Sequence, residues 1–347
     1  MKATSERNAM PGGAEDAPTD AHPTTPNPAV AQPHAAASYA VSVGPGTAAG
    51  DAITARNLTR TYGTKNKVFT AVKGINLDVP KGEVFALLGT NGAGKTSTMD
   101  MLEGLARPNG GSVRVLGQDP VANRRQLRPH IGTMLQEGGF SRDLTVRETL
   151  TMWCGTLSEP RDPVKLLGEL NLTDRAEVRV SALSGGERRR LDLACALANA
   201  SPSVLFLDEP TTGLDPESRA TAWELLRAQN ANGTTIVLTT HYLEEAEELA
   251  ARLAIMHQGE IARSGTIEEI VADHPAVITF RTLNRRLPDP LASLAETVGP
   301  RTTIETTRLQ EHLAVLLRWA DAENVTLSGL SAREATLESV FLGIANS

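Results

Sequence analysis

The residues best suited to chemistry in this chain begin at Gly89, where the sequence reads Gly-Thr-Asn-Gly-Ala-Gly-Lys-Thr as far as Thr96. Glycines let the backbone curl tightly and turn its N–H groups toward an anion. Lys95 supplies a mobile positive charge for phosphate groups, and the Thr96 hydroxyl is a type of ligand that suits Mg²⁺. The segment is therefore a P-loop, which predicts a binding site for nucleotide phosphates.

The elements that must position this loop are visible on both sides of it. An unbroken apolar run at residues 84–88 predicts a strand buried on both faces of a parallel sheet. The stretch from Lys95 to Leu102 lacks helix breakers and predicts a helix whose N-terminus faces the loop. The alternative interpretation is a chance glycine-rich turn, which this strand and helix context disfavours.

A second apolar run, residues 204–207, ends in Asp208 and Glu209. A carboxylate at the C-terminal edge of a parallel strand lies where ligands bind in open α/β sheets. We expect Asp208 to hold Mg²⁺ and Glu209 to act as the general base for an attacking water. The alternative, a solvated loop carboxylate at Glu209, is disfavoured by its position directly after a buried strand.

The string Leu-Ser-Gly-Gly-Glu at residues 183–187 precedes a segment of helical composition. Ser184 is a plausible N-cap, so this is a second helix start that can bind an anion. One chain cannot easily bring two such starts to the same γ-phosphate. We therefore expect a head-to-tail dimer in which this string of one copy caps the ATP held by the other. The alternatives are a simple capping turn and, at 188–190, a solvated basic face.

In this order and spacing the motifs resemble the ATP-binding subunits of ATP-binding cassette (ABC) transporters, over roughly residues 53–270. The resemblance implies an α/β fold, a P-loop NTPase domain with an antiparallel β subdomain and a helical subdomain at about 140–180. It implies hydrolysis of ATP with Mg²⁺, coupled to transport. The site residues it implies are Tyr62, Gly89, Thr90, Asn91, Gly92, Ala93, Gly94, Lys95, Thr96, Ser97, Gln136, Ser184, Gly185, Gly186, Glu187, Asp208, Glu209, Asp215 and His241.

The resemblance also implies a role for each of these residues. Tyr62 stacks on adenine, for which the alternative is a core tyrosine. The loop from Gly89 to Ser97 holds the phosphates, and Lys95, Glu209 and His241 are catalytic. The residues implied to bind the metal are Thr96, Gln136 and Asp208. Signature residues 184–187 and Asp215 of the D-loop lie at the dimer interface, and Glu187 stands where the family usually has Gln. We expect Glu187 to keep that role and to pair with a nearby arginine.

The composition limits the other classes of function. The chain has 347 residues, 40% of them hydrophobic, and a net charge of −7, which argues against broad nucleic-acid binding. Cys154 and Cys195 lie in apolar, helix-like segments and are predicted to be buried free thiols of a reducing cytoplasm. No stretch approaches the roughly 18 apolar residues needed to span a bilayer, and no signal-peptide core is present. We expect a cytoplasmic protein, peripheral on the inner face of the membrane, with separate permease subunits.

The chain divides into three parts. Residues 1–50 are rich in Ala and Pro, with seven of the chain's 20 prolines, and are predicted to be disordered. Residues 53–270 form the ATP-binding domain. Within it, residues 75–79 alternate apolar and polar as a half-exposed antiparallel strand does. A helical stretch at about 145–173, broken by Pro160 and Pro163, is the expected permease-docking surface. Phe140 is an equally good candidate for a contact there or a core residue.

Residues 275–347 predict a small α+β accessory domain. Residues 276–280 are typical of a strand, and Leu309, Leu313, Leu316 and Ala320 mark one face of a helix. A further strand is expected at 325–327, before a final helix. The ending from Thr336 to Gly343 is similar to that of drug-exporter ATPases of the daunorubicin-resistance type, where this appendage serves dimer contacts or regulation.

Two other functions compete with that of an exporter ATPase. Soluble ABC ATPases of translation or DNA repair usually carry tandem cassettes or long coiled coils, whereas this chain has one P-loop, one signature and no sustained heptads. A nucleotide-binding regulator without turnover is disfavoured by Glu209 and His241. The pairing of the cassette, as a homodimer or with a different cassette, stays open.

Overall fold

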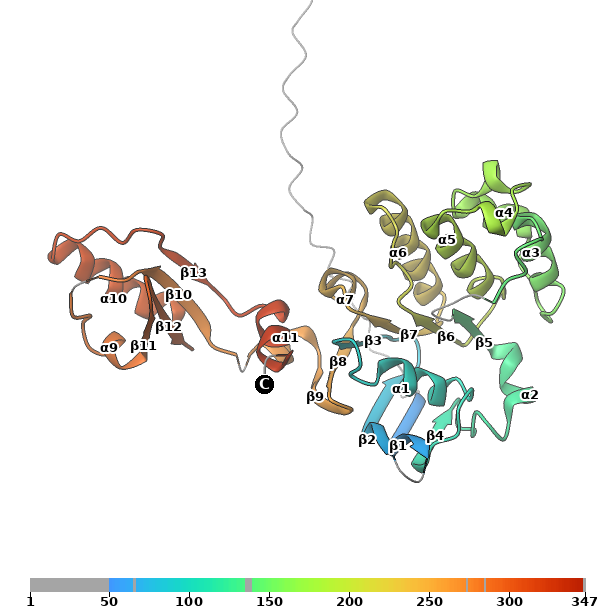
Figure 1. Cartoon of the computed structure of the whole chain (residues 1–347), viewed down its shortest axis with the longest axis horizontal. Coiled ribbons are helices and arrows are strands. Elements are labelled where there is room, and N and C mark those ends of the chain that lie inside the picture. Colours follow the sequence, from blue (N-terminus) through green and yellow to red (C-terminus); the bar gives the residue numbers. More distant parts are fainter. Residues whose placement is uncertain (1–49, 65–66, 135–138, 273, 284, 346–347) are drawn as a thin grey trace, which may run out of the picture. The chain divides into compact units, whose positions relative to one another are not determined.

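The computed structural model describes residues 50–64, 67–134, 139–272, 274–283 and 285–345. Of the N-terminal tail, predicted at residues 1–50, only Gly50 lies within these ranges. Three β-sheets with associated helices make up the described part of the chain, which confirms the predicted α/β class (Figure 1).

The central sheet holds the strands that carry the predicted motifs. Its order is β5-β6-β7-β3-β8-β9, and all neighbouring pairs are parallel except β8 and β9. Its members are β3 (Val84–Gly89), β5 (Ile131–Met134), β6 (Val204–Asp208), β7 (Thr235–Thr240), β8 (Arg252–His257) and β9 (Glu260–Gly265). Every residue of β3, β6 and β7 is buried. For β3 and β6 this confirms the prediction from the apolar runs at 84–88 and 204–207.

A smaller antiparallel sheet precedes and follows the P-loop in sequence. It has the order β2-β1-β4, from β1 (Asp51–Thr64), β2 (Lys67–Pro80) and β4 (Gly110–Val115). The predicted alternation at residues 75–79 is confirmed, because Ile75, Leu77 and Val79 are buried while the residues between them are exposed. These side chains share a core with Phe85 and Leu87 of β3.

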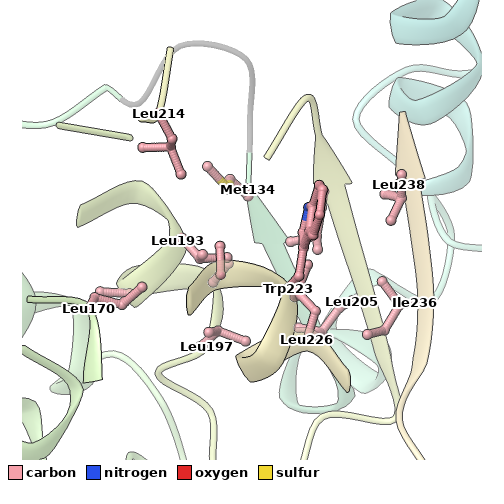
Figure 2. Close-up of a cluster of buried hydrophobic side chains, with 14 of the residues drawn as sticks. Met134, Leu170, Leu193, Leu197, Leu205, Leu214, Trp223, Leu226, Ile236 and Leu238 are labelled. Carbon is pink, nitrogen blue, oxygen red and sulfur yellow. The ribbon is translucent and has the colours of Figure 1, made fainter. Parts of the chain in front are cut away.

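The other face of the central sheet is covered by helices. Figure 2 shows Leu193 of α5 (Gly185–Ala196), Leu197 directly after that helix and Trp223 of α6 (Pro216–Ala231) among the side chains of β6 and β7. The remaining helices of this part are α1 (Lys95–Leu102), α2 (Arg124–Leu127), α7 (Leu243–Leu249) and α8 (Ile267–Ala272).

The predicted helical subdomain contains α3 (Val146–Cys154) and α4 (Pro163–Glu169). Thr145 opens α3 with a capping box, and Asp162 caps α4 through the N–H of Val164. Pro163 therefore begins a helix rather than breaking one, since its missing N–H costs nothing in the first turn. Cys154 and Cys195 are buried and free, as predicted.

The C-terminal region has its own antiparallel sheet, ordered β11-β12-β10-β13. Its elements are β10 (Ala276–Arg281), α9 (Leu291–Leu294), β11 (Ala295–Val298), β12 (Arg301–Thr306), α10 (Leu309–Ala322) and β13 (Ser331–Arg333). The predicted face of α10 packs on this sheet, with Leu316 fully buried. The strand predicted at 325–327 is wrong. The N–H of Val325 bonds to the Ala320 carbonyl at 2.8 Å and ends α10, so β13 forms later in the chain.

The last helix, α11 (Leu337–Ala345), packs with the ATP-binding part of the chain. Leu337 and Val340 are 1% and 2% exposed and belong to the same buried cluster as Leu253 and Ile255 of β8. Within the described ranges, no helix is both long enough and apolar enough to cross a membrane.

Glu103, which follows α1, is a half-buried acid close to two other acids, Asp100 and Asp208. Burial, with the nearby charges of Asp100 and Asp208, raises the pKa of its carboxyl to about 9. Among the described residues its Oε2 atom has no hydrogen-bond partner. Since the folded pKa lies above the unfolded one, folding favours the protonated form. The stability that this proton contributes is complete below pH about 4.5 and is lost as the pH rises toward 9.

We expect Glu103→Gln to raise the free energy of unfolding at pH 8 by roughly 1–3 kcal/mol and to change it little at pH 4.5, because glutamine resembles the protonated acid. Urea denaturation at both pH values measures the difference. The same change in stability at both values would contradict the assignment.

Candidate functional site

The predicted P-loop lies between β3 and α1 and lines a cavity of about 720 Å³. Gly94 has a φ of 104°, and a Cβ atom there would lie 2.4 Å from the Ala71 carbonyl oxygen, so only glycine fits this turn. The residues that line the cavity are Tyr62, Phe69, Ala71, Gly89, Thr90, Asn91, Gly92, Ala93, Gly94, Lys95, Thr96, Ser97, Glu209, His241 and Phe341.

Lys95 is held inside this loop and is only 7% exposed. Its Nζ atom donates hydrogen bonds to the carbonyl oxygens of Gly89 at 2.8 Å and Thr90 at 3.4 Å. Burial lowers the pKa of the ammonium, while the carboxylates of Glu209 and Asp208 act in the opposite direction. The cation is thus partly stripped of water, which strengthens its attraction for phosphate, while the two nearby carboxylates keep it protonated.

The parallel pairing of β6 with β7 places Asp208 and Glu209 beside the C-terminal end of β7. Asp208 pairs with Thr239, and the Thr239 hydroxyl donates a hydrogen bond to Asp208 Oδ1. The same hydroxyl accepts the backbone N–H of Glu209 at 3.0 Å. Thr239 therefore joins the predicted metal-binding carboxylate to the predicted general base.

The Glu209 side chain turns toward His241. Its Oε1 atom lies 3.2 Å from His241 Nδ1, and its Oε2 atom accepts a bond from the Thr212 hydroxyl at 3.3 Å. Glu209 itself has a φ of 51°, a left-handed conformation that costs about 1–3 kcal/mol in a residue other than glycine. Surrounding bonds hold the carboxylate in this strained position, so its direction is set by the fold.

Tyr62 borders the same cavity from β1. Its ring is 39% exposed, and its hydroxyl lies 3.1 Å from the Ser97 hydroxyl of α1. The guanidinium of Arg60 stands 4.7 Å from the ring centre. The alternative of a core tyrosine is excluded by this exposure.

The signature string begins α5 away from this cavity. Ser184 and Glu187 form a capping box, in which the Ser184 hydroxyl accepts the Glu187 N–H and Glu187 accepts the Ser184 N–H. The predicted arginine partner of Glu187 is Arg175, at 2.6 Å. The Ser184 hydrogen bond and the contact with Arg175 lower the pKa of Glu187. Ser184 and Gly185 are exposed.

Asp215 is also exposed, and it caps α6 through hydrogen bonds from the N–H and hydroxyl of Ser218. Neither Asp215 nor the signature lines the P-loop cavity of its own chain. Gln136 lies outside the described residues, two positions beyond the end of β5 at Met134.

Three supporting residues were missed by sequence reasoning. Arg189 is 8% exposed and donates to the backbone carbonyls of Asp208 and Glu209, so the alternative of a solvated basic face at 188–190 is wrong for this residue. Arg189 lies four residues before Leu193 on α5, so the two side chains share one face of the helix. This spacing from an apolar residue was the signal in the sequence that Arg189 is buried.

The other two are Thr239 and Glu245. Thr239 follows the apolar residues 236–238 near the end of its strand, which was the only indication in the sequence. Glu245 is fully buried, and its Oε1 atom accepts hydrogen bonds from Thr211 at 2.7 Å and from the Trp223 indole at 3.3 Å. Desolvation raises the pKa of Glu245. No sequence pattern pointed to a buried acid on α7.

The comparisons with known proteins agree with this geometry. The family model of ABC transporters matches residues 72–212, and the model named ABC transporter domain-containing protein-like, C-terminal domain, matches residues 276–336. The Nod factor export ATP-binding protein I of Paraburkholderia xenovorans is 40% identical over 67% of this chain and 76% of its own length. The daunorubicin resistance ATP-binding protein DrrA2 of Streptomyces coeruleorubidus is 37% identical over 84% and 94%.

Among solved structures, a dimeric ATP-binding cassette in a post-hydrolysis state bound to ADP and Pi superposes with a TM-score of 0.56 at 25% identity. The match covers 62% of this chain and 98% of that one.

A P-loop beside two strand-end carboxylates and a histidine defines a P-loop ATPase. Together with the signature helix and the relatives, it identifies the class more closely. The chain belongs to the ABC transporter family, as an ATP-binding subunit of the exporter type that resembles the daunorubicin-resistance ATPases.

We expect Thr239→Val to lower ATPase turnover by about tenfold to a hundredfold. The substitution removes the hydroxyl that bonds to both the Asp208 carboxylate and the Glu209 N–H, so these two residues lose a common support. Nucleotide affinity should stay near that of the wild type, since Thr239 does not line the cavity. Phosphate-release kinetics and calorimetric titration with nucleotide measure the two effects.

Thr235→Val is the matched control, because Thr235 lies at the opposite end of β7, where its hydroxyl accepts the Gly82 N–H at 2.9 Å. Equal losses of turnover in both variants would indicate a general defect of β7 and would contradict the role of Thr239.

Proposed function

We propose that this chain binds Mg-ATP, dimerises around two nucleotides and uses their hydrolysis to drive partner permease subunits of an exporter. The observation that carries the proposal is the Glu209–His241 contact of 3.2 Å at the wall of the P-loop cavity. It supports hydrolysis rather than nucleotide storage, because a carboxylate fixed beside the phosphate site is suited to take a proton from water.

In this proposal the backbone of the P-loop and Lys95 hold the β- and γ-phosphates of ATP. A water oxygen attacks the γ-phosphorus, the bond to the β-phosphate oxygen breaks, and Glu209 receives the proton of the water. His241 contacts the γ-phosphate and keeps the Glu209 carboxylate directed at the water. Tyr62 offers its ring to the adenine base.

The Thr96 hydroxyl and the Asp208 carboxylate fit Mg²⁺, because both are hard oxygen donors. Thr96 lines the cavity, and Asp208 directly precedes Glu209, which also lines it. Gln136 completes the proposed set of protein ligands. Bound Mg²⁺ supplies neutralisation of the negative charge on the β- and γ-phosphate oxygens. Among the described residues, no cluster of three or more His, Cys, Asp or Glu side chains suits a metal. That agrees with an ion held mainly by phosphate.

The dimer is supported by the position of the signature. Ser184 and Gly185 start a helix at an exposed surface, and they are absent from the cavity of their own chain. A second copy placed head to tail supplies this helix N-terminus to the γ-phosphate, with Asp215 at the same interface. The structural neighbour that is a dimeric cassette bound to ADP and Pi supports this arrangement.

The permease contact is proposed for a groove between α3 and the ATP-binding core. This cavity of about 560 Å³ is lined by apolar side chains that include Leu105, Ile131 and Trp153, and by charged residues that include Arg124 and Arg128. Phe140 packs edge-on against Trp153, with ring centroids 6.3 Å apart. An apolar groove beside an aromatic pair suits a short helix of a membrane subunit. Such docking holds the chain at the inner face of the membrane.

The alternative of a soluble ATPase for translation or DNA repair is not favoured by the relatives, whose names describe export and drug resistance. The net charge of −7 also argues against a nucleic-acid partner.

Glu209→Gln should retain ATP binding, lower phosphate release by about a hundredfold or more and accumulate ATP-bound dimer, since glutamine cannot accept the proton. Light scattering after size exclusion with Mg-ATP reports the dimer, and Glu224→Gln, an exposed change on α6, is the control. Unchanged phosphate release would remove Glu209 from its role. Full turnover by a monomer at saturating Mg-ATP would reject the dimer.

Lys95→Ala should instead weaken nucleotide binding by about tenfold or more, because a charged hydrogen-bond donor to the phosphates is lost. Calorimetric titration with ADP and with a non-hydrolysable ATP analogue measures the change. An unaltered dissociation constant would show that the phosphates bind elsewhere.

A further inference from the structure

The walls of the P-loop cavity include three residues that the family motifs do not assign, Phe69, Ala71 and Phe341. Phe341 lines the cavity together with Tyr62, Phe69 and the loop from Gly89 to Ser97. It comes from α11, whereas the other lining residues all lie within the ATP-binding part of the chain. The nucleotide cavity thus includes a side chain from the last helix of the protein.

The packing of α11 explains how Phe341 reaches this position. Leu337 and Val340 are buried in the core cluster of the ATP-binding part, and Phe341 and Ile344 pack against the same cluster. The spacing of these residues defines one apolar stripe along the helix. The stripe faces α8 and β8, the elements beside which α11 lies in Figure 1.

Phe341 lies at the edge of this stripe and is only partly buried. Part of its ring therefore borders the cavity. Two further aromatic side chains line the same cavity, Tyr62 at 39% exposure and Phe69 at 60% exposure. Exposed aromatic rings around a phosphate-binding loop provide flat apolar surface for the base or sugar of a nucleotide.

We propose that Phe341 contacts the bound purine nucleotide, so that α11 forms part of the nucleotide site. The inference rests on the proposed function, in which this cavity binds ATP. Because the nucleotide contacts α11 only when the helix is docked on the core, binding and docking stabilise each other by the same factor. Nucleotide binding thereby reaches the C-terminal region through a direct contact.

The competing explanation is that Phe341 only fills the stripe. Phe341→Leu separates the two, since leucine keeps an apolar side chain on the stripe but removes the ring from the cavity. A packing role alone predicts a lower melting temperature with an unchanged nucleotide affinity. A nucleotide contact predicts weaker binding at a temperature where the variant is fully folded. Leu342→Ala is the matched control, because Leu342 is 50% exposed on the same helix and does not line the cavity.

The first measurement is calorimetric titration of the full chain with a non-hydrolysable ATP analogue and Mg²⁺. We expect Phe341→Leu to raise the dissociation constant about fivefold and Leu342→Ala to leave it unchanged. Equal affinities of Phe341→Leu and the wild type would overturn the proposal. If the wild type itself does not bind the analogue, the proposed function fails first, so the two failures are distinguishable.

The second measurement is hydrogen exchange of α11 in the wild type, which does not depend on the folding of any Phe341 variant. The analogue should slow exchange of residues 337–345 in the wild type and in Leu342→Ala. Lys95→Ala, at an analogue concentration too low to occupy its site, should show no such protection. If the rate of hydrogen exchange in α11 of the wild type is the same with and without the bound analogue, the proposal is overturned.

Discussion

The parallel register of β3, β6 and β7 is the constraint on which the rest of this structure depends. Pairing of Asp208 with Thr239 and of Leu88 with Thr240 brings three strand ends to one edge of the sheet. The P-loop, the two carboxylates and His241 all follow these ends within a few residues. Thr239 then joins neighbouring ends through its hydroxyl, which contacts both Asp208 and the N–H of Glu209. The geometry of the proposed catalytic residues is thus a consequence of strand pairing in a buried sheet.

Charge is concentrated under this edge in a way that apolar packing alone would not tolerate. Lys95, Arg189 and Asp208 are each less than one-tenth exposed. Each is compensated locally, because Lys95 bonds to loop carbonyls and Arg189 bonds to the carbonyls of Asp208 and Glu209. Buried ions that are fully bonded are rigid, since moving one leaves its partners unsatisfied. Rigidity of this kind suits a site that must stabilise charge on a phosphate without reorganising.

Two features near this edge of the sheet depend on contacts with other segments of the chain. They are the strained backbone of Glu209 and the packing of helix α11. Thr212 and His241 hold the Glu209 carboxylate from two sides. Leu337 and Val340 bury α11 in the core of the ATP-binding part, although a whole antiparallel sheet separates them from it in sequence. Burial of their apolar surface, worth about 25 cal/mol per Å², stabilises the packing of α11 on this core. The wall formed by Phe341 exists only because of that packing.

Much of the site was determined by the sequence itself, because the P-loop, the signature and the strand-end acids depend on local backbone chemistry. The local structure was predicted by the glycines at Gly92 and Gly94, by the cap at Ser184 and by the continuous apolar runs of β3 and β6. Tertiary structure alone decided which polar groups support them. Arg189, Glu245 and Phe341 gain their partners from segments far away in the chain, and β13 replaced a strand expected at 325–327 because α10 ends in a turn there. Local patterns specify how the backbone curls, whereas contacts between distant segments arise only when the whole core closes.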